Sequence, residues 1–134
     1  MSPTLNCGRS RPLIVKPPRE GSSIGITKVE GYSADQLKNA AAIIDAGQTL
    51  NLAVKGQMIS VMVALGESGL RVLDYGDGPG PDSRGLFQQR DNGAWGSYAD
   101  RMDPMTSATN FFRALLKVPE WQTMPPTIAA HRTQ

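Results

Sequence analysis

The sequence predicts a mainly α-helical fold, because apolar residues recur at helical spacing and capping residues stand where helices would begin. The chain has 134 residues, 40% of them hydrophobic and 19% charged, which is typical of an ordinary globular protein with a single core. Its formal net charge is +2, and no dense group of lysines and arginines indicates nucleic-acid binding. We therefore expect one domain over residues 31–134.

Residues 1–30 are expected to form an extended arm or linker. Four prolines interrupt this stretch, and it shows no helical period. The adjacent Pro17 and Pro18 also argue against a secretory signal peptide. No apolar run approaches the roughly 18 residues that a membrane span needs. A lone cysteine, Cys7, leaves the redox compartment open.

Two helices are expected in the first half of the domain. The first begins at Ser33, which forms an S-x-x-Q capping box with Gln36, and ends at Gly47. The second runs from about residue 54 to residue 67 or 68, with Gly69 as a left-handed cap. Its residues are apolar nearly all round, which predicts that the whole helix is buried.

Two further helices are expected near the C-terminus. Asp103 and Pro104 are a cap and a first-turn proline, so a third helix begins there. Pro119 ends it, a short turn holds Trp121, and a last helix begins near Pro126.

The connection from Arg71 to about Arg101 is unusually long for a compact domain, and long connections are often functional. It could contain a small β-hairpin that turns at residues 75–78. We expect this loop or hairpin to line a substrate cleft beside the end of the second helix.

Glu67 is the candidate catalytic residue of this cleft. Val63 and Ala64 precede it on the same helical face, and it stands at the negative end of the helix dipole. Both features favour the protonated carboxyl group that a general acid needs. The alternative is a glutamate at a helix end that simply points into water.

Four short motifs follow one another in the chain: E-S-G-L at 67–70, Y-G-D at 75–77, S-x-G-L-F-Q-Q-R at 83–90 and W-G at 95–96. Together they resemble the soluble lytic transglycosylase and goose-type lysozyme superfamily. They are most similar to an actinobacterial and actinophage branch of tail-associated or secreted peptidoglycan-degrading domains. The resemblance extends from Gly31 to Arg132 and implies a lysozyme-like domain.

The resemblance also implies residue roles. Glu67 aligns with the catalytic acid/base, and Asp77 is a candidate second carboxylate. Ser83 and Gln88 would contact the sugars, Leu86 and Phe87 would form the cleft floor, and Tyr75 and Trp95 would stack on a sugar ring. Phe87 and Trp95 could instead be core residues. The substrate-binding candidates are Ser83, Leu86, Phe87, Gln88, Gln89, Tyr75 and Trp95.

The implied activity is cleavage of the β-1,4 bond between N-acetylmuramic acid and N-acetylglucosamine. Arg90 stands where goose-type lysozymes have an aspartate, so we favour the lytic transglycosylase route to a 1,6-anhydro product. The alternatives are a lysozyme-type hydrolase and a phage virion or wall-binding module with little activity. The chain ends earlier than that branch, at Gln134, which indicates a shortened last helix.

The expected partners are peptidoglycan glycan strands and other phage virion or lysis proteins, at the bacterial cell wall. The absence of a signal peptide favours a phage protein over a secreted bacterial enzyme. We expect no cofactor and no metal, because one histidine and one cysteine cannot form a zinc site and the aspartates of the loop miss the EF-hand spacing. We also expect no nucleic acid and no membrane span.

Overall fold

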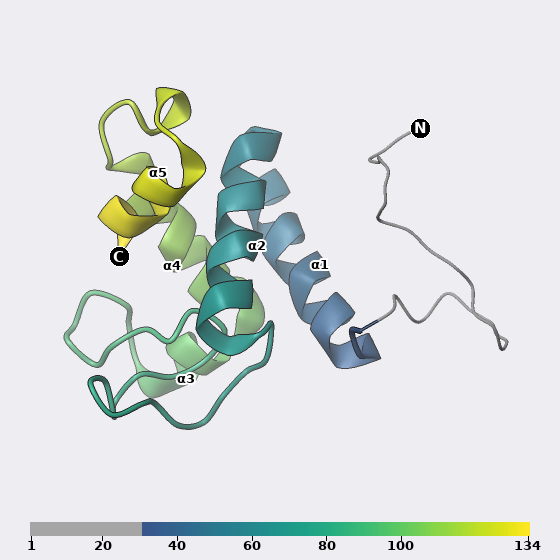
Figure 1. Ribbon diagram of the computed structural model, residues 1–134, viewed down its shortest axis with the longest axis vertical. Coiled ribbons are helices and arrows are strands. Elements are labelled where there is room, and N and C mark those ends of the chain that lie inside the picture. Colours follow the sequence, from purple (N-terminus) through teal and green to yellow (C-terminus); the bar gives the residue numbers. More distant parts are fainter. Residues whose placement is uncertain (1–30) are drawn as a thin grey trace, which may run out of the picture. The chain divides into compact units, whose positions relative to one another are not determined.

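The computed structural model describes residues 31–134, and helices account for the regular structure of this range (Figure 1). The elements are α1 (Ala34–Thr49), α2 (Val54–Ser68), α3 (Tyr98–Met102), α4 (Pro104–Leu116), the 3-10 turn η2 (Trp121–Thr123) and α5 (Pro126–Thr133). No β-strand is found within residues 31–134. The mainly α fold class is therefore confirmed, whereas the predicted arm, residues 1–30, lies outside the described residues.

The chain divides into two units, Met1–Leu37 and Lys38–Gln134, and the core belongs to the second. There, α2 packs against α4 and α5, and these two helices also contact each other. The core side chains are aliphatic and aromatic, and three phenylalanines occupy its centre. Phe87 stacks on Phe111 with ring centroids 5.0 Å apart, and Phe112 meets Phe111 edge-on at 6.2 Å.

The capping box at the start of α1 is confirmed. The backbone N–H of Ser33 donates to Gln36 Oε1 at 2.7 Å, and the N–H of Gln36 donates to Ser33 Oγ at 3.2 Å. The predicted stop at Gly47 is wrong, because α1 continues to Thr49. Gly47 instead permits close packing, since a Cβ there would lie 3.1 Å from Cζ of Phe112.

The bounds of α2 agree with the prediction, and Gly69 closes the helix in the left-handed conformation at φ 66°. Its predicted burial on all sides is wrong. One face, which includes Ile59 and Val63, is in the core, but Val54 and Met58 are 72% and 56% exposed. The neighbouring helices cover only one side of α2, so the apolar character of the other side is not explained by the described fold.

The end of the long connection was not predicted. A short helix, α3, begins after Ser97, whose side chain forms a reciprocal capping box with Asp100. Asp103 then caps α4 by accepting a hydrogen bond from the N–H of Thr106 at 2.8 Å, as expected. The irregular connection therefore ends at Ser97, before the predicted Arg101.

The predicted hairpin with a turn at residues 75–78 is not present. The connection contains a single antiparallel bridge, between Arg84 and Gln89, whose backbone groups exchange two hydrogen bonds of 3.1 Å. The turn that joins them is formed by residues 85–88. Within the described residues, no helix has the length and apolar character needed to cross a membrane.

Candidate functional site

The loop between α2 and α3, residues 69–97, carries most of the predicted site residues, and the end of α2 carries the remaining one, Glu67. The side chain of Glu67 is exposed to solvent, so it does not lie in the apolar surroundings that the sequence argument required. Its Oε2 accepts a hydrogen bond from Nε2 of Gln134 at 3.3 Å. The C-terminal residue of the chain therefore lies beside this carboxylate.

Ser68, the next residue, joins α2 to the middle of the loop. Its Oγ lies 2.7 Å from the carbonyl oxygen of Leu86 and 3.0 Å from that of Ala64, and it accepts a hydrogen bond from the N–H of Arg71 at 3.2 Å. The Ser side chain is buried. The motif at 67–70 thus ends helix α2 and attaches the loop to it.

Leu86 and Phe87, the predicted cleft floor, are 0% and 1% exposed and belong to the hydrophobic core. This placement leaves their side chains no surface for a ligand. The loop brings them inward through a tight turn in which Gly85 has φ 81° and Gln88 has φ 48°. The Nε2 of Gln88 donates to the carbonyl oxygen of Gly85 at 3.1 Å, which closes the turn.

Gln89 and Ser83 are also buried, at 4% and 5% exposure. The amide of Gln89 donates to the carbonyl oxygen of Ser107 at 3.1 Å, so this side chain fastens the loop to α4. The contact was not predicted, because nothing in the sequence relates residue 89 to residue 107. Of the remaining candidates, Tyr75 is 63% exposed, and Trp95 and Gln88 are half-buried.

Asp77, the candidate second carboxylate, stabilises a turn of the loop. Its Oδ1 accepts a hydrogen bond from the N–H of Gly80 at 2.8 Å. This local bond between a side chain and the backbone three residues later is typical of a turn aspartate.

Sequence reasoning missed two groups of charged side chains on the loop. In the first, the hydroxyl of Tyr98 donates to Asp74 Oδ1 at 2.6 Å, and Nε of Arg84 lies 3.4 Å from the same oxygen. The hydrogen bond to Asp74 raises the pKa of Tyr98 above its ordinary value, because it stabilises the protonated phenol.

The second group surrounds Asp82. Its carboxylate accepts hydrogen bonds from the N–H of Asp91 at 2.7 Å and from Nε of Arg90 at 2.8 Å. The backbone hydrogen bond from Asp91, assisted by Arg90, lowers the pKa of Asp82. Arg101 lies beneath this group, 4% exposed, and donates to the carbonyl oxygen of Asp82 at 2.9 Å. Only the frequency of opposite charges between residues 74 and 101 could have indicated these contacts.

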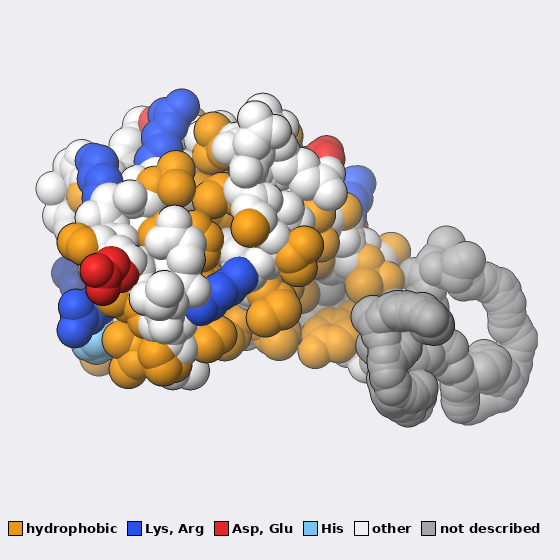
Figure 2. All heavy atoms as spheres, turned by 90° about the horizontal axis from the view of Figure 1, so that it is seen from above, with side chains coloured by type: hydrophobic (Ala, Val, Ile, Leu, Met, Phe, Trp, Pro, Cys, Tyr) orange, Lys and Arg blue, Asp and Glu red, His pale blue; other side chains and the backbone are white. Residues whose placement is uncertain are grey.

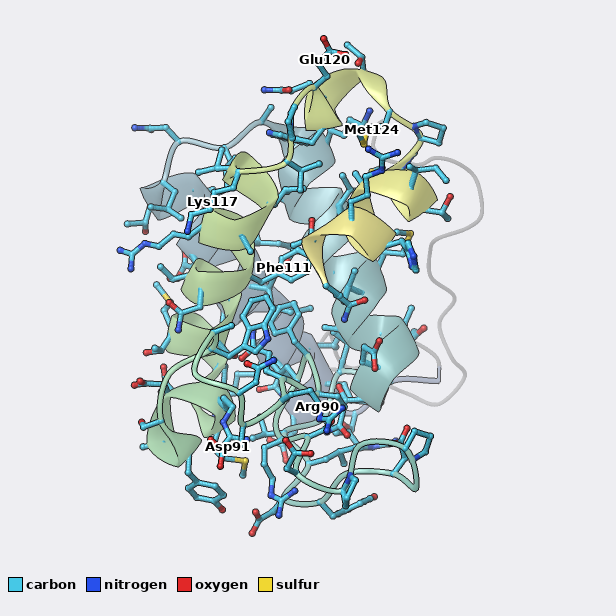
Figure 3. All side chains as sticks on the ribbon, turned by 90° about the vertical axis from the view of Figure 1, so that its left-hand side faces the viewer. Arg90, Asp91, Phe111, Lys117, Glu120 and Met124 are labelled. Atoms are coloured by element: carbon cyan, nitrogen blue, oxygen red, sulfur yellow. The ribbon has the colours of Figure 1, made fainter. Side chains whose placement is uncertain are left out.

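Arg90 and Asp91 form the accessible part of the second group, on the loop below Phe111 in Figure 3. The side chain of Arg90 is 51% exposed, and that of Asp91 is 67% exposed. Among the described residues, Arg90 donates a hydrogen bond through its Nε, to Asp82, and no contact is found for its two terminal nitrogens, which are hydrogen-bond donors. Residues 31–134 contain no group of three histidine, cysteine or acidic side chains that could hold a metal ion.

No family model matches the chain. Parts of it are similar to curated proteins named D-alanine–D-alanine ligase. It is 72% identical to the ligase of Methylibium petroleiphilum over 32 residues, which are 24% of this chain and 9% of the ligase. It is 43% identical to the ligase of Bordetella pertussis over 65 residues, or 46% of this chain and 20% of the ligase. The chain thus spans a fifth or less of the length of these relatives.

These similarities contradict the family predicted from the four loop motifs. The named relatives are ligases, whereas the motifs were interpreted as those of a lytic transglycosylase or lysozyme. The predicted peptidoglycan cleavage, and with it the predicted assignment to wall-degrading and phage lysis proteins, is therefore wrong. The structure gives these motif residues structural roles: Ser68 attaches the loop, Gly69 ends α2, and Phe87 packs in the core.

Proposed function

We propose that this chain is a partial relative of the D-alanine–D-alanine ligases that binds the D-alanyl-D-alanine unit rather than completing its synthesis alone. The observation that carries the proposal is the 72% identity with a D-alanine–D-alanine ligase over 32 residues. The matches cover 9% and 20% of the two ligases, so they do not by themselves carry over the activity of the whole enzyme. Binding of D-alanyl-D-alanine requires fewer residues than its synthesis, so it is the activity that we propose for this chain.

The charges of the loop support a zwitterionic ligand. D-alanyl-D-alanine carries an ammonium group at one end and a carboxylate at the other. Arg90 offers two terminal nitrogens in the planar arrangement that binds a carboxylate with two hydrogen bonds. The exposed carboxylate of Asp91 is next to it in the chain and suits the ammonium group. Glu67 and Tyr75, both exposed, stay candidate contacts for the remainder of the ligand.

Peptidoglycan stays a proposed partner, now as a carrier of D-alanyl-D-alanine rather than as a substrate to be cut. Its stem peptides present this dipeptide at their ends. The mildly basic chain, with a net charge of +2, is not repelled from an anionic wall. Loop contacts with the glycan strand through Tyr75 and the half-buried Trp95 and Gln88 would add to recognition of the peptide.

Titration of the 15N-labelled chain with D-alanyl-D-alanine, followed by amide chemical shifts, tests this function. A ligand of this size reaches a Kd of about 1 mM, by the usual binding free energy per atom. We expect the largest shifts at Arg90 and Asp91. Arg90→Gln should weaken binding at least about fivefold, since it removes one charge-assisted contact. Arg113→Gln, an exposed arginine of α4, is the matched control and should bind as the wild type does.

The stereoisomer L-alanyl-L-alanine provides the decisive comparison, because it has the same charges and atoms. Equal shifts with both dipeptides would reduce the interaction to non-specific charge pairing and contradict the proposal. So would an unchanged affinity of Arg90→Gln for the D,D-dipeptide.

A further inference from the structure

Asn92 and Gly93 form the one asparagine–glycine pair of the sequence. Both residues are exposed, and residues 91–95 belong to no helix or strand. Gly93 has φ 85°, and a Cβ at this position would meet nothing within 4 Å. The surroundings of this pair therefore leave room for a chemical change of the asparagine side chain.

Two features of the loop favour attack by the backbone nitrogen of Gly93 on the side-chain carbonyl carbon of Asn92. Among residues 31–134, no hydrogen bond is found for the N–H of Gly93, so its nitrogen gives up no bond when it reacts. The N–H of Ala94 donates to Asn92 Oδ1 at 3.0 Å, which turns the side chain toward the residues that follow it. This donor stands on the oxygen that becomes negative during the attack, and such a donor lowers the barrier.

The other asparagines of the described residues lack this combination. Asn51 is also exposed and lies in a turn, but the N–H of Leu52 donates to the carbonyl oxygen of Gly47 at 2.9 Å. Asn39 and Asn110 lie inside α1 and α4, where the backbone N–H of the following residue is held by the helical hydrogen bonds. These three asparagines therefore provide internal comparisons for Asn92.

We propose that Asn92 is a site of spontaneous deamidation, with water as the co-reactant. The nitrogen of Gly93 forms a bond to Cγ of Asn92 and loses its proton to a base in the solvent, while the bond from Cγ to Nδ2 breaks and ammonia leaves with a proton from water. Water then opens the resulting cyclic imide at either carbonyl, which gives aspartate or isoaspartate. The net change is one water taken up and one ammonia released. This reaction does not depend on the ligand proposed for the loop.

Deamidation places a new carboxylate directly after Asp91, whose own carboxylate is 67% exposed. The formal net charge of the chain falls by one, from +2 to +1. Figure 2 shows a face on which hydrophobic and uncharged side chains predominate, so an added charge is a clear change for so weakly charged a chain. Isoaspartate also lengthens the main chain by a methylene group, next to the residue whose N–H bonds Asp82. The modification therefore alters the accessible group that Arg90 and Asp91 form.

Incubation of the full chain at physiological temperature, followed by tryptic digestion and mass spectrometry, tests the proposal. Trypsin cleaves after lysine and arginine, so Asn92 falls in peptide 91–101, Asn110 in 102–113, and Asn39 and Asn51 in 39–55. Peptide 91–101 should gain the mass difference between an amide and an acid at least about tenfold faster than the other two, which corresponds to a barrier lower by about 1.4 kcal/mol. The rate should rise from about pH 6 to about pH 8, because a base must remove the proton of the attacking nitrogen.

Two variants provide the controls. Asn92→Gln keeps an amide but needs a larger ring for the same attack, so its peptide 91–101 should keep its mass. Gly93→Ala places a methyl group beside the attacking nitrogen and should slow the mass gain by about tenfold. Equal rates at all four asparagines, or an unchanged rate in Gly93→Ala, would overturn the proposal. So would a rate in the folded chain more than about tenfold below that of the isolated peptide 91–101, because the fold would then protect Asn92.

Discussion

Helix α2 and the loop segment 83–90 exchange the roles that their sequences predict. The helix reads as a fully buried central element, yet its Val54 and Met58 are exposed. The loop segment reads as the lining of a cleft, yet its Leu86 and Phe87 are among the most buried side chains of the described residues. Apolar content therefore locates surfaces that need to be covered, but not which element covers them.

The difference arises from how the two segments are held. The loop segment is held inward by two polar contacts, from Ser68 to the carbonyl oxygen of Leu86 and from Gln89 to that of Ser107. These bonds satisfy buried backbone groups, which otherwise carry a large free-energy cost. The regular helix satisfies its own backbone hydrogen bonds, so its outer face can stay exposed without a covering element.

Replacement of Phe87 and of Met58 by alanine compares the two segments most directly. Phe87→Ala removes a fully buried ring that stacks on Phe111, and the loss of packing and the remaining cavity should lower the free energy of unfolding by about 3–5 kcal/mol. Met58→Ala on exposed α2 should change it by less than about 0.5 kcal/mol. Urea unfolding at low micromolar protein concentration measures both. Similar losses at the two positions would contradict the exchange of roles.

Two glycines of the loop sharpen the comparison, because they share a backbone conformation but differ in how closely other atoms surround them. Gly85 and Gly93 have φ angles of 81° and 85°, and a Cβ would lie 1.9 Å from the carbonyl oxygen of Arg101 at the first but would meet nothing within 4 Å at the second. Gly93→Ala should cost about 1 kcal/mol, the price of the left-handed conformation. Gly85→Ala should cost roughly 3 kcal/mol, because the backbone must also shift.

Thermal and urea unfolding of the two glycine variants decide this point. If both variants lost the same free energy of unfolding, the backbone at residue 85 would be free to move away from α3. The two glycine variants together therefore measure how rigidly the segment 83–90 is held in the structure.

The helix ends could be predicted from sequence because their signals are local. Ser33 with Gln36, Gly69, and Asp103 with Pro104 each act within one turn of the residue that they cap, and all three appear where expected. The capping box of Ser97 and Asp100 is equally local and was available to the same reasoning. By contrast, the predicted stop at Gly47 is wrong, because Gly47 lies in close contact with Gln57 and Phe112, which are 10 and 65 positions away in the chain.

The site could be predicted less well, for a related physical reason. The burial of the loop segment that contains Phe87 depends on contacts such as those of Gln89 with Ser107 and Arg101 with Asp82, which join residues 18 and 19 positions apart. No periodicity or capping rule encodes such pairs. Short motifs suggested a chemistry for these residues, but the similarity to D-alanine–D-alanine ligases contradicts it.

The smallest expected effect is the pH dependence of stability, which comes from a charged residue of the loop, Asp82. Because the pKa of Asp82 is lowered in the folded protein, its contribution to stability is present above the ordinary carboxyl pKa of about 4 and is lost as the pH falls through the lowered value. Asp82→Asn should therefore unfold at a slightly lower urea concentration than the wild type at pH 7. The difference should shrink progressively as the pH is lowered below about 4, because the wild-type carboxylate is then increasingly protonated. Asp45→Asn on α1 is the matched control, since no described residue donates a hydrogen bond to its carboxylate. A difference between Asp82→Asn and the wild type that persists in acid would show that the loop is held by the shape of residue 82 and not by its charge.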